Sequence, residues 1–458
     1  MEQTPRSDWT SSLRTIIVAL MAVAVLVGMV AGKKLPFGAE GQRLKAEVLL
    51  RAGDTFMSMY YVALRNDWSE SRTDVVFDAA GDFYSMAYET DPDNFRALLC
   101  TTIMLRLGGR KEAAAALVPR LMFRELPENE RKVLGRVAPM ILYTFPAESA
   151  IESARDYLFG FGPGPGLVAN SYREIEQPEK ASETISAAAE QALPKLRTVV
   201  AVTVLNAVLA LIGITWFVAV VLLSRRRRQG VETAPLVEGL GVREAIEALI
   251  VWVFLAALLG SYAPWSSSAA GEGKALVVLA NTVAAQVGAL IWVCLMTVFR
   301  ARFGWRRAGL IRALGTGLAA TGLVLVPVLG VYALVQDRLG MSPLDDPVIL
   351  IIAAPEDWRT RALIIAAVGL VVPAFEETLF RGLLFGALRR NMKFWPAAAA
   401  SALLFAIVHM NLPGLAAYFL LGLTFAVVFE RTRSLFAPWA AHAVFNLVNL
   451  AMVFAIFG

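Results

Sequence analysis

The sequence predicts an all-α membrane protein: a polytopic bundle of transmembrane helices, one N-terminal anchor, and a soluble helical domain of solenoid-like character. Apolar residues make up 57% of the 458 residues, charged residues only 18%, and the mean hydropathy is +0.58. Soluble domains carry about 25% charged residues. Apolar runs of membrane-spanning length recur in the C-terminal half, and a more polar stretch with helical spacing precedes them.

Four segments follow from this pattern. An apolar run at 15–31 follows two arginines, and its length and weak cleavage signature predict an uncleaved signal anchor within residues 1–32. The predicted soluble helical domain spans 33–197. A transmembrane helix and a basic cytoplasmic loop occupy 198–240, and the remaining helices form a core at 241–458.

Part of the soluble segment resembles a tetratricopeptide-type helical hairpin. Residues 80–117 contain a DPDN turn between two helical stretches and a GGRKEAA start for the next helix. A Gly/Pro-rich stretch, FGFGPGPG at 159–166, predicts a loop. A domain of this kind is expected to bind a protein partner or to recruit a substrate.

After Arg197 the chain consists mainly of apolar runs, each of roughly 20 residues. Lys and Arg concentrate in alternate loops, beginning with Arg225–Arg228, and the positive-inside rule makes these loops cytoplasmic. Residues 33–197 are then extracytoplasmic, although Lys33 and Lys34 argue the other way. We expect an integral protein of a bacterial inner or plasma membrane, in contact with lipid and without a nucleic-acid partner. The runs lie at 198–223, 246–264, 275–299, 313–336, 361–388, 394–410, 412–429 and 435–457.

Two adjacent glutamates and an arginine lie within one apolar run, VVPAFEETLFRGLLFGALRR. Ionised residues in a spanning helix are costly, so each is a candidate functional residue. Glu377 and Arg381 are four apart and can pair on one face. Glu376 lies about 100° round the helix and stays available. A charge-compensated packing pair would explain Glu377 and Arg381 but not Glu376.

The chain has two histidines, and both lie in the same C-terminal stretch as the glutamates. His409 shares a helical face with Phe405, and His442 shares one with Asn446. Either pair alone is typical of polar contacts between helices. At about 1.5 Å per residue, Glu376 and the two histidines can all lie near the middle of the membrane. The coincidence indicates a shared site.

These motifs resemble one known family. EExxxR, FxxxH and HxxxN occur as FEETLFR (375–381), FAIVH (405–409) and HAVFN (442–446), with one helix between the last two. This order is similar to that of the CPBP (Abi) family of CAAX-processing and bacteriocin-processing intramembrane proteases, which includes the type II CAAX prenyl endopeptidase. The resemblance covers roughly residues 240–458.

The resemblance implies an intramembrane endopeptidase that hydrolyses peptide bonds of membrane-associated or C-terminal substrates. It implies that Glu376 activates a water molecule, that His409 positions this water, and that His442 and Asn446 donate hydrogen bonds to the oxyanion. Glu377 and Arg381 would orient Glu376, and Arg381 is also a candidate for binding a substrate carboxylate. No cysteine lies near the motifs and no serine lies in a nucleophile elbow, so a carboxylate-activated water is the simplest chemistry.

Several alternatives stay open at the level of sequence. Glu376, His409 and His442 together are a plausible zinc set, but no HExxH helix is present, and a metal-free glutamate site fits equally well. Buried Glu, Arg and His also serve transporters and proton relays. A non-catalytic membrane scaffold with a helical binding domain is the third interpretation.

Overall fold

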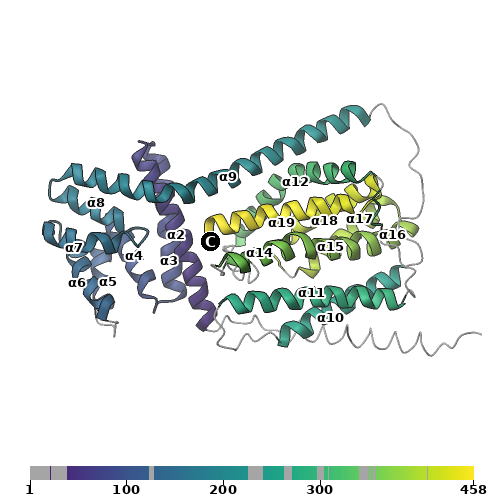
Figure 1. Cartoon of the computed structure of the whole chain (residues 1–458), viewed down its shortest axis with the longest axis horizontal. Coiled ribbons are helices and arrows are strands. Elements are labelled where there is room, and N and C mark those ends of the chain that lie inside the picture. Colours follow the sequence, from purple (N-terminus) through teal and green to yellow (C-terminus); the bar gives the residue numbers. More distant parts are fainter. Residues whose placement is uncertain are drawn as a thin grey trace, which may run out of the picture. The chain divides into compact units, whose positions relative to one another are not determined.

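The computed structural model describes residues 21, 39–122, 128–224, 241–262, 271–296, 304–307, 309–339, 349, 352–353, 357–409 and 411–457. These residues are helical or lie in short connections, and none of them forms a strand. The predicted all-α class is therefore confirmed (Figure 1). The predicted signal anchor (Met21 apart) and the basic run at 225–228 lie outside the described residues.

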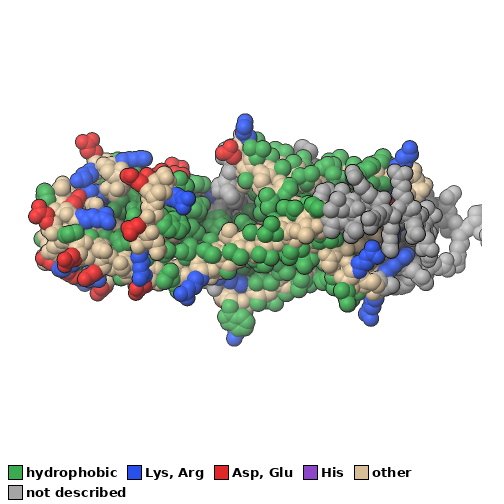
Figure 2. All heavy atoms as spheres, turned by 90° about the horizontal axis from the view of Figure 1, so that it is seen from above, with side chains coloured by type: hydrophobic (Ala, Val, Ile, Leu, Met, Phe, Trp, Pro, Cys, Tyr) green, Lys and Arg blue, Asp and Glu red, His purple; other side chains and the backbone are tan. Residues whose placement is uncertain are grey.

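The chain divides into two compact units, described separately here. One unit takes in Thr203–Ala451, and the other Pro36–Val202 together with Met452–Gly458. Figure 2 shows charged side chains spread over the surface of the second unit and a nearly continuous hydrophobic surface over the first. We call them the membrane unit and the soluble unit.

The soluble unit is built from consecutive helices that each pack against the next. α2 packs on α3, α3 on α4, α4 on α5, α5 on α6, α6 on α7 and α7 on α8. This order agrees with a solenoid-like arrangement. The helices are α2 (Ala39–Arg65), α3 (Glu70–Thr90), α4 (Phe95–Leu107), α5 (Lys111–Met122), α6 (Glu128–Leu142), α7 (Glu148–Leu158) and α8 (Gly164–Glu174).

The local signals in this unit have clear structural counterparts. The DPDN turn separates α3 from α4, and the Asn94 side chain accepts a hydrogen bond from the Ala97 N–H as the N-cap of α4. The loop predicted at 159–166 is shorter than expected: residues 159–163 connect α7 to α8, and residues 164–166 form the first turn of α8, where proline is tolerated. The Tyr61 hydroxyl donates to Gly162 O at 2.7 Å and accepts from the Gly166 N–H at 3.0 Å. Turn and loop chemistry therefore fix these connections.

The membrane unit contains most of the apolar helices. Six helices in the described part of the chain are long and apolar enough to cross a membrane, and Phe394–Val408 is a shorter apolar helix. Their outer faces carry exposed apolar side chains such as Ile311, Leu211 and Val326, as expected for a surface in contact with lipid. Four of the six spans lie in α11 (Gly271–Met296), α12 (Leu310–Leu339), α18 (Leu415–Thr432) and α19 (Phe436–Phe457), and the other two are Pro178–Trp216 and Trp358–Asn391. The shorter apolar helix is α17 (Phe394–Val408), and α10 (Val242–Tyr262) also belongs to this unit.

Small residues allow the helices around the site to approach closely. Ala313 and Ala320 of α12 pack against Val428 of α18 and Ala437 of α19. The hydroxyl of Thr321 donates to Ala441 O at 2.8 Å and links α12 to α19. Close backbone contact through small residues and hydroxyl hydrogen bonds is the usual way in which helices associate in lipid.

The predicted span at 361–388 is one apolar helix of changing pitch, Trp358–Asn391. It comprises α14 (Trp358–Ala366), the π-helical η2 (Ala367–Val371), α15 (Val372–Glu377), the π-helical η3 (Thr378–Phe385) and α16 (Gly386–Asn391). Packing on this helix comes from α10, α11, α17 and α18. Its π-helical segments lie directly on either side of α15, which carries the two glutamates.

The helix predicted at 198–223 begins much earlier than its composition suggested. α9 runs without interruption from Pro178 to Ser224 and passes through Pro194. The change from polar to apolar residues therefore falls inside a helix, because a helix can continue while its surroundings change. The helix predicted at 246–264 forms as α10, but it is not among the six candidate spans.

Candidate active site

The two glutamates lie where the helix changes pitch. A π-helical turn bonds each N–H to the carbonyl five residues earlier and occurs frequently at functional sites. The N–H of Val372 accordingly donates to Ala367 O. Glu376 and Glu377 are the last two residues of the short helix α15, and η3 begins at the next residue. The wider turns on both sides set the direction of these side chains.

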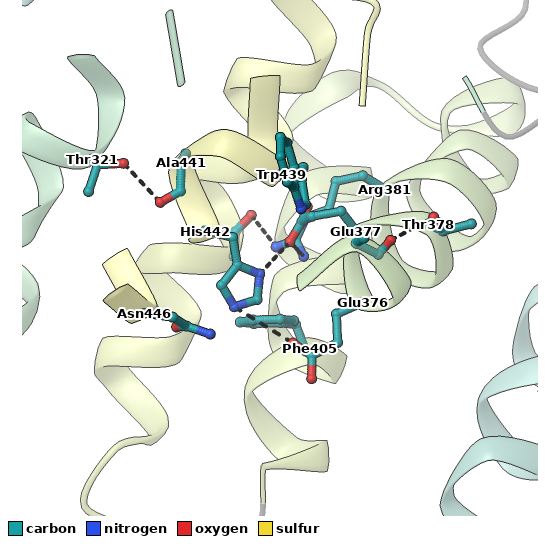
Figure 3. Close-up of polar contacts among 12 residues, drawn as sticks. Thr321, Glu376, Glu377, Thr378, Arg381, Phe405, Trp439, Ala441, His442 and Asn446 are labelled. Carbon is teal, nitrogen blue, oxygen red and sulfur yellow. Dashed lines mark hydrogen bonds and ion pairs between the residues drawn. The ribbon is translucent and has the colours of Figure 1, made fainter. Parts of the chain in front are cut away.

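Glu377 is the centre of a buried ion-pair network (Figure 3). Its Oε1 accepts from Arg381 Nη1 at 3.0 Å and from His442 Nδ1 at 3.0 Å. Glu377 and Arg381 are both fully buried, and Arg381 Nη2 donates to Gly422 O at 3.1 Å. The network thus joins η3, α18 and α19 to α15. A buried carboxylate and a buried guanidinium compensate each other, which is the condition for keeping either of them in a membrane helix.

Aromatic rings enclose this network. The Arg381 guanidinium lies 4.6 Å from the ring centroid of Phe405 and 5.1 Å from that of Phe425. Phe425 also stacks on the ring of His442, with centroids 5.0 Å apart. Cations are attracted to ring faces, so these rings hold both Arg381 and the imidazole in place. Since Arg381 is fully enclosed, its contacts favour a positioning role over the binding of a substrate carboxylate.

Glu376 faces the other nitrogen of His442. Glu376 Oε2 and His442 Nε2 are 3.7 Å apart, which is beyond hydrogen-bond distance but within the range of an ion pair. Because Glu377 accepts the proton on Nδ1, Nε2 is the nitrogen left to interact with Glu376 or with a bound molecule. Glu376 is buried but not fully enclosed, with 7% of its surface exposed.

His409 lies at the C-terminal end of α17, and its ring donates a hydrogen bond to a backbone carbonyl in the last turn of that helix. Its backbone N–H donates to Ala406 O, so Phe405 O lacks its usual partner. His409 Nδ1 lies 2.6 Å from Phe405 O, and because a carbonyl only accepts, Nδ1 must carry the proton. The ring stacks on Tyr418 with centroids 4.3 Å apart. This arrangement leaves Nε2 of the neutral ring as an acceptor.

Asn446 donates from Nδ2 to Val368 O in η2 at 2.9 Å. One N–H of the amide is therefore bound to the backbone. The structure brings Glu376, Glu377, Arg381 and His442 into direct contact, and both histidine rings contact Phe405. Figure 3 shows His442 between Asn446 and Glu377, with the Phe405 ring below the imidazole and beside Glu376.

Several residues of the site carry no signal in the sequence. Phe425 and Tyr418 on α18 stack on the two histidines, and Trp439 on α19 donates to Leu370 O of η2 at 3.0 Å. Aromatic residues are common in membrane helices, so only the three-dimensional contact distinguishes these from the others. Phe405 is the exception, because its four-residue spacing from His409 placed both on one face.

Glu376, His409 and His442 are the zinc set considered from the sequence. Within the described residues, no three His, Cys, Asp or Glu side chains are arranged to hold a metal ion. Nδ1 of His409 and Nδ1 of His442 each bond to a protein acceptor, so Nε2 is the nitrogen that each ring has available.

Comparison with known proteins points to the same segment. Residues 358–448 match the family model described as "Type II CAAX prenyl endopeptidase Rce1-like". That segment is therefore similar to the Rce1-like CAAX protease domain. All three motifs lie within it.

A curated relative supports this match over a similar length. The chain is 38% identical over 90 residues to a Bacillus subtilis (strain 168) protein named "Putative membrane peptidase YdiL". The aligned part is 20% of this chain and 37% of that relative, so the likeness covers about a third of the relative's length. No solved structure matches the chain.

Proposed function

We propose that this protein is an intramembrane endopeptidase that hydrolyses peptide bonds of membrane-associated or C-terminal substrates with a water molecule activated by Glu376. The observation that carries the proposal is the position of Glu376 beside Nε2 of His442. The other ring nitrogen of His442 bonds to Glu377, which Arg381 holds in place. The match of this segment to the Rce1-like family model supports the same reaction class.

In the proposed reaction, one water lies between Glu376 and Nε2 of His409. Glu376 accepts a proton from this water while its oxygen attacks the scissile carbonyl carbon. His409 accepts a hydrogen bond from the same water, which its fixed tautomer permits. General-base catalysis by a positioned carboxylate typically contributes about 10²–10⁴-fold in rate.

His442 serves the oxyanion in this proposal. In its protonated form it donates from Nδ1 to Glu377 and presents Nε2–H to the developing negative charge. The proton held by Glu376 then passes to the leaving amine as the C–N bond breaks, which returns Glu376 to its ionised state and gives a carboxylic acid and an amine.

The position in the membrane is part of the proposal. We place the soluble unit on the extracytoplasmic face of a bacterial plasma membrane, because the positive-inside rule predicts that the Arg-rich loops of the sequence are cytoplasmic. There it would contact protein partners or substrates before they reach the membrane unit.

The test is cleavage of a quenched-fluorescent peptide library by the purified protein in detergent. The library includes prenylated, unprenylated and membrane-spanning peptides, and each assay is run for wild type and for Glu376→Ala, with and without a chelator. We expect cleavage by the wild type that the chelator leaves intact and that Glu376→Ala abolishes. Equal inactivity of both proteins across the library would contradict the proposal and favour a scaffold or a transporter.

A further inference from the structure

We infer that Asn446 is a positioning residue that replaces the backbone N–H missing at Pro373 and so holds the π-helical turn that presents Glu376. The inference rests on the proposed function, because the effect it predicts on cleavage is exerted through Glu376. It gives Asn446 a task in addition to, or in place of, donation to an oxyanion.

Counting backbone hydrogen bonds in η2 leads to this inference. The N–H of Val372 donates to Ala367 O, five residues back. In the same π-helical register, the next donor, residue 373, would bond to Val368 O. Residue 373 is proline, which has no N–H. Asn446 Nδ2 lies 2.9 Å from Val368 O and donates to the carbonyl that Pro373 leaves without a donor.

Close packing of α19 on η2 makes this contact possible. A Cβ built on Gly369 would lie 2.5 Å from Cδ2 of Leu447, which shows how closely the side chains of α19 approach η2 at this point. Leu447 follows Asn446 directly, so the same close approach brings the amide to Val368. A carbonyl that lacks a donor is costly within a membrane helix, so the bond from Asn446 stabilises this turn.

The consequence for Glu376 follows from helix geometry. Glu376 is three residues after Pro373 on the same short helix. Slipping from a π-helical to an α-helical register removes one residue from the turn, and each residue corresponds to about 100° of rotation. If η2 lost the Val368 hydrogen bond, Glu376 would turn away from His442, although neither residue had been changed.

The test is a double-mutant cycle with Asn446→Leu and Pro373→Ala, measured as the cleavage rate of one peptide that the wild type hydrolyses. Pro373→Ala restores a backbone N–H that can donate within the turn. We expect Asn446→Leu to lower kcat by about tenfold or more in the wild type and by less than about threefold in the Pro373→Ala background. Loss of kcat by the same factor in both backgrounds would overturn the inference and favour an oxyanion role.

Asn449→Leu is the matched control. Asn449 is on the same helix, but its amide donates to Phe445 O of α19 itself at 2.8 Å, so its replacement should leave kcat near the wild-type value. A large loss of kcat in Asn449→Leu would show that any asparagine change in α19 is harmful and would contradict the specific role of Asn446.

The wild type, Asn446→Leu, Pro373→Ala and the double variant are also compared by thermal unfolding in detergent. This measurement does not depend on cleavage. Asn446→Leu should lower the unfolding midpoint by at least about 2 °C in the wild type and by much less when Pro373→Ala is present. Equal shifts in both backgrounds would overturn the inference even if Pro373→Ala were inactive. If the wild type cleaved nothing, the proposed function would fail while this coupling could still be observed.

Discussion

His409 shows how one side chain can be fixed by its own helix and still keep a reactive atom. Its Nδ1 donates to Phe405 O, its face stacks on Tyr418, and Nε2 remains as an acceptor. The ring therefore combines a structural contact with a proposed role in holding water. These two contributions can be separated by substitution.

We expect His409→Asn to keep the helix-end hydrogen bond through its amide N–H but to lose the Nε2 acceptor. Cleavage should fall by about 10²–10⁴-fold, while the thermal unfolding midpoint stays close to that of the wild type. His409→Ala, which loses both contacts, should lower both quantities. Wild-type cleavage by His409→Asn would show that Nε2 takes no part in the reaction.

At the scale of the residue, the sequence predicted a contact within one helix but not the contacts between helices. The EExxxR, FxxxH and HxxxN motifs placed Glu377 beside Arg381 because helical spacing alone decides that contact. Other contacts depend on how α18 and α19 lie against the helix 358–391. These are the bond from His442 to Glu377, the bond from Asn446 to Val368 and the stacking of Phe425 on His442. Spacing within one helix carries no information on such contacts.

The site depends on the helix of changing pitch at 358–391. The sequence predicted an apolar span there, and Pro373 predicted a disturbance near the glutamates. The sequence did not predict π-helical turns on both sides of α15. Pro373 marks a disturbance on one side only, and the residues of η3 carry no proline that would indicate a wider turn. The continuous α9 was missed for a related reason, since composition reports the surroundings of a helix and not its ends.

The contact between α17 and α18 gives a prediction at the scale of the element. A Cβ on Gly422 would lie 2.8 Å from Cα of Ala402, and Gly422 O also accepts from Arg381. We expect Gly422→Ala to force the two helices apart, to lower the free energy of unfolding by about 1–3 kcal/mol, and to reduce cleavage by moving Arg381.

Gly330→Ala on α12 is the matched control, because a Cβ there meets nothing within 4 Å. Removing a flexible glycine from a helix interior stabilises by roughly 0.5–1 kcal/mol, so this variant should be as stable as the wild type or more so. Unfolding in a denaturant series measures both variants. If Gly422→Ala and Gly330→Ala shifted stability alike, close packing at Gly422 would not matter.

At the scale of the whole molecule, the two units obey different physical chemistry. The membrane unit pairs its fully buried Glu377 with Arg381, whereas the soluble unit carries many exposed charges. In the soluble unit, the hydroxyl of the buried Tyr172 on α8 donates to Glu152 Oε1 at 2.6 Å. Burial together with this bond raises the pKa of Tyr172 to about 12, and the same bond lowers the pKa of Glu152 below 4.5.

The sign of the resulting pH dependence is fixed by the lowered pKa of Glu152. Its contribution to stability is present above the unfolded-state value of 4.5 and is lost as the pH falls through the folded-state pKa. We therefore expect Tyr172→Phe to destabilise the soluble unit at pH 7 and to differ much less from the wild type at about pH 3. Hydrogen exchange of α7 and α8 measures this difference.

Tyr143→Phe makes the same atomic change at an exposed tyrosine and should have little effect at either pH. A constant difference between Tyr172→Phe and the wild type across this pH range would contradict the assignment to Glu152. The sequence predicted the helices of this unit from periodicity and turn residues, but not this bond, because Tyr172 and Glu152 belong to different helices.

The most direct test of the central claim is the effect of Glu376→Gln on kcat and on peptide binding, measured on one peptide that the wild type cleaves. Glutamine has nearly the same shape as glutamate but cannot take a proton from water. The account predicts that kcat falls by at least about 10²-fold while the Kd of the peptide and the unfolding midpoint stay near wild-type values. Cleavage by Glu376→Gln at the wild-type rate would show that another group activates the water and would contradict the account.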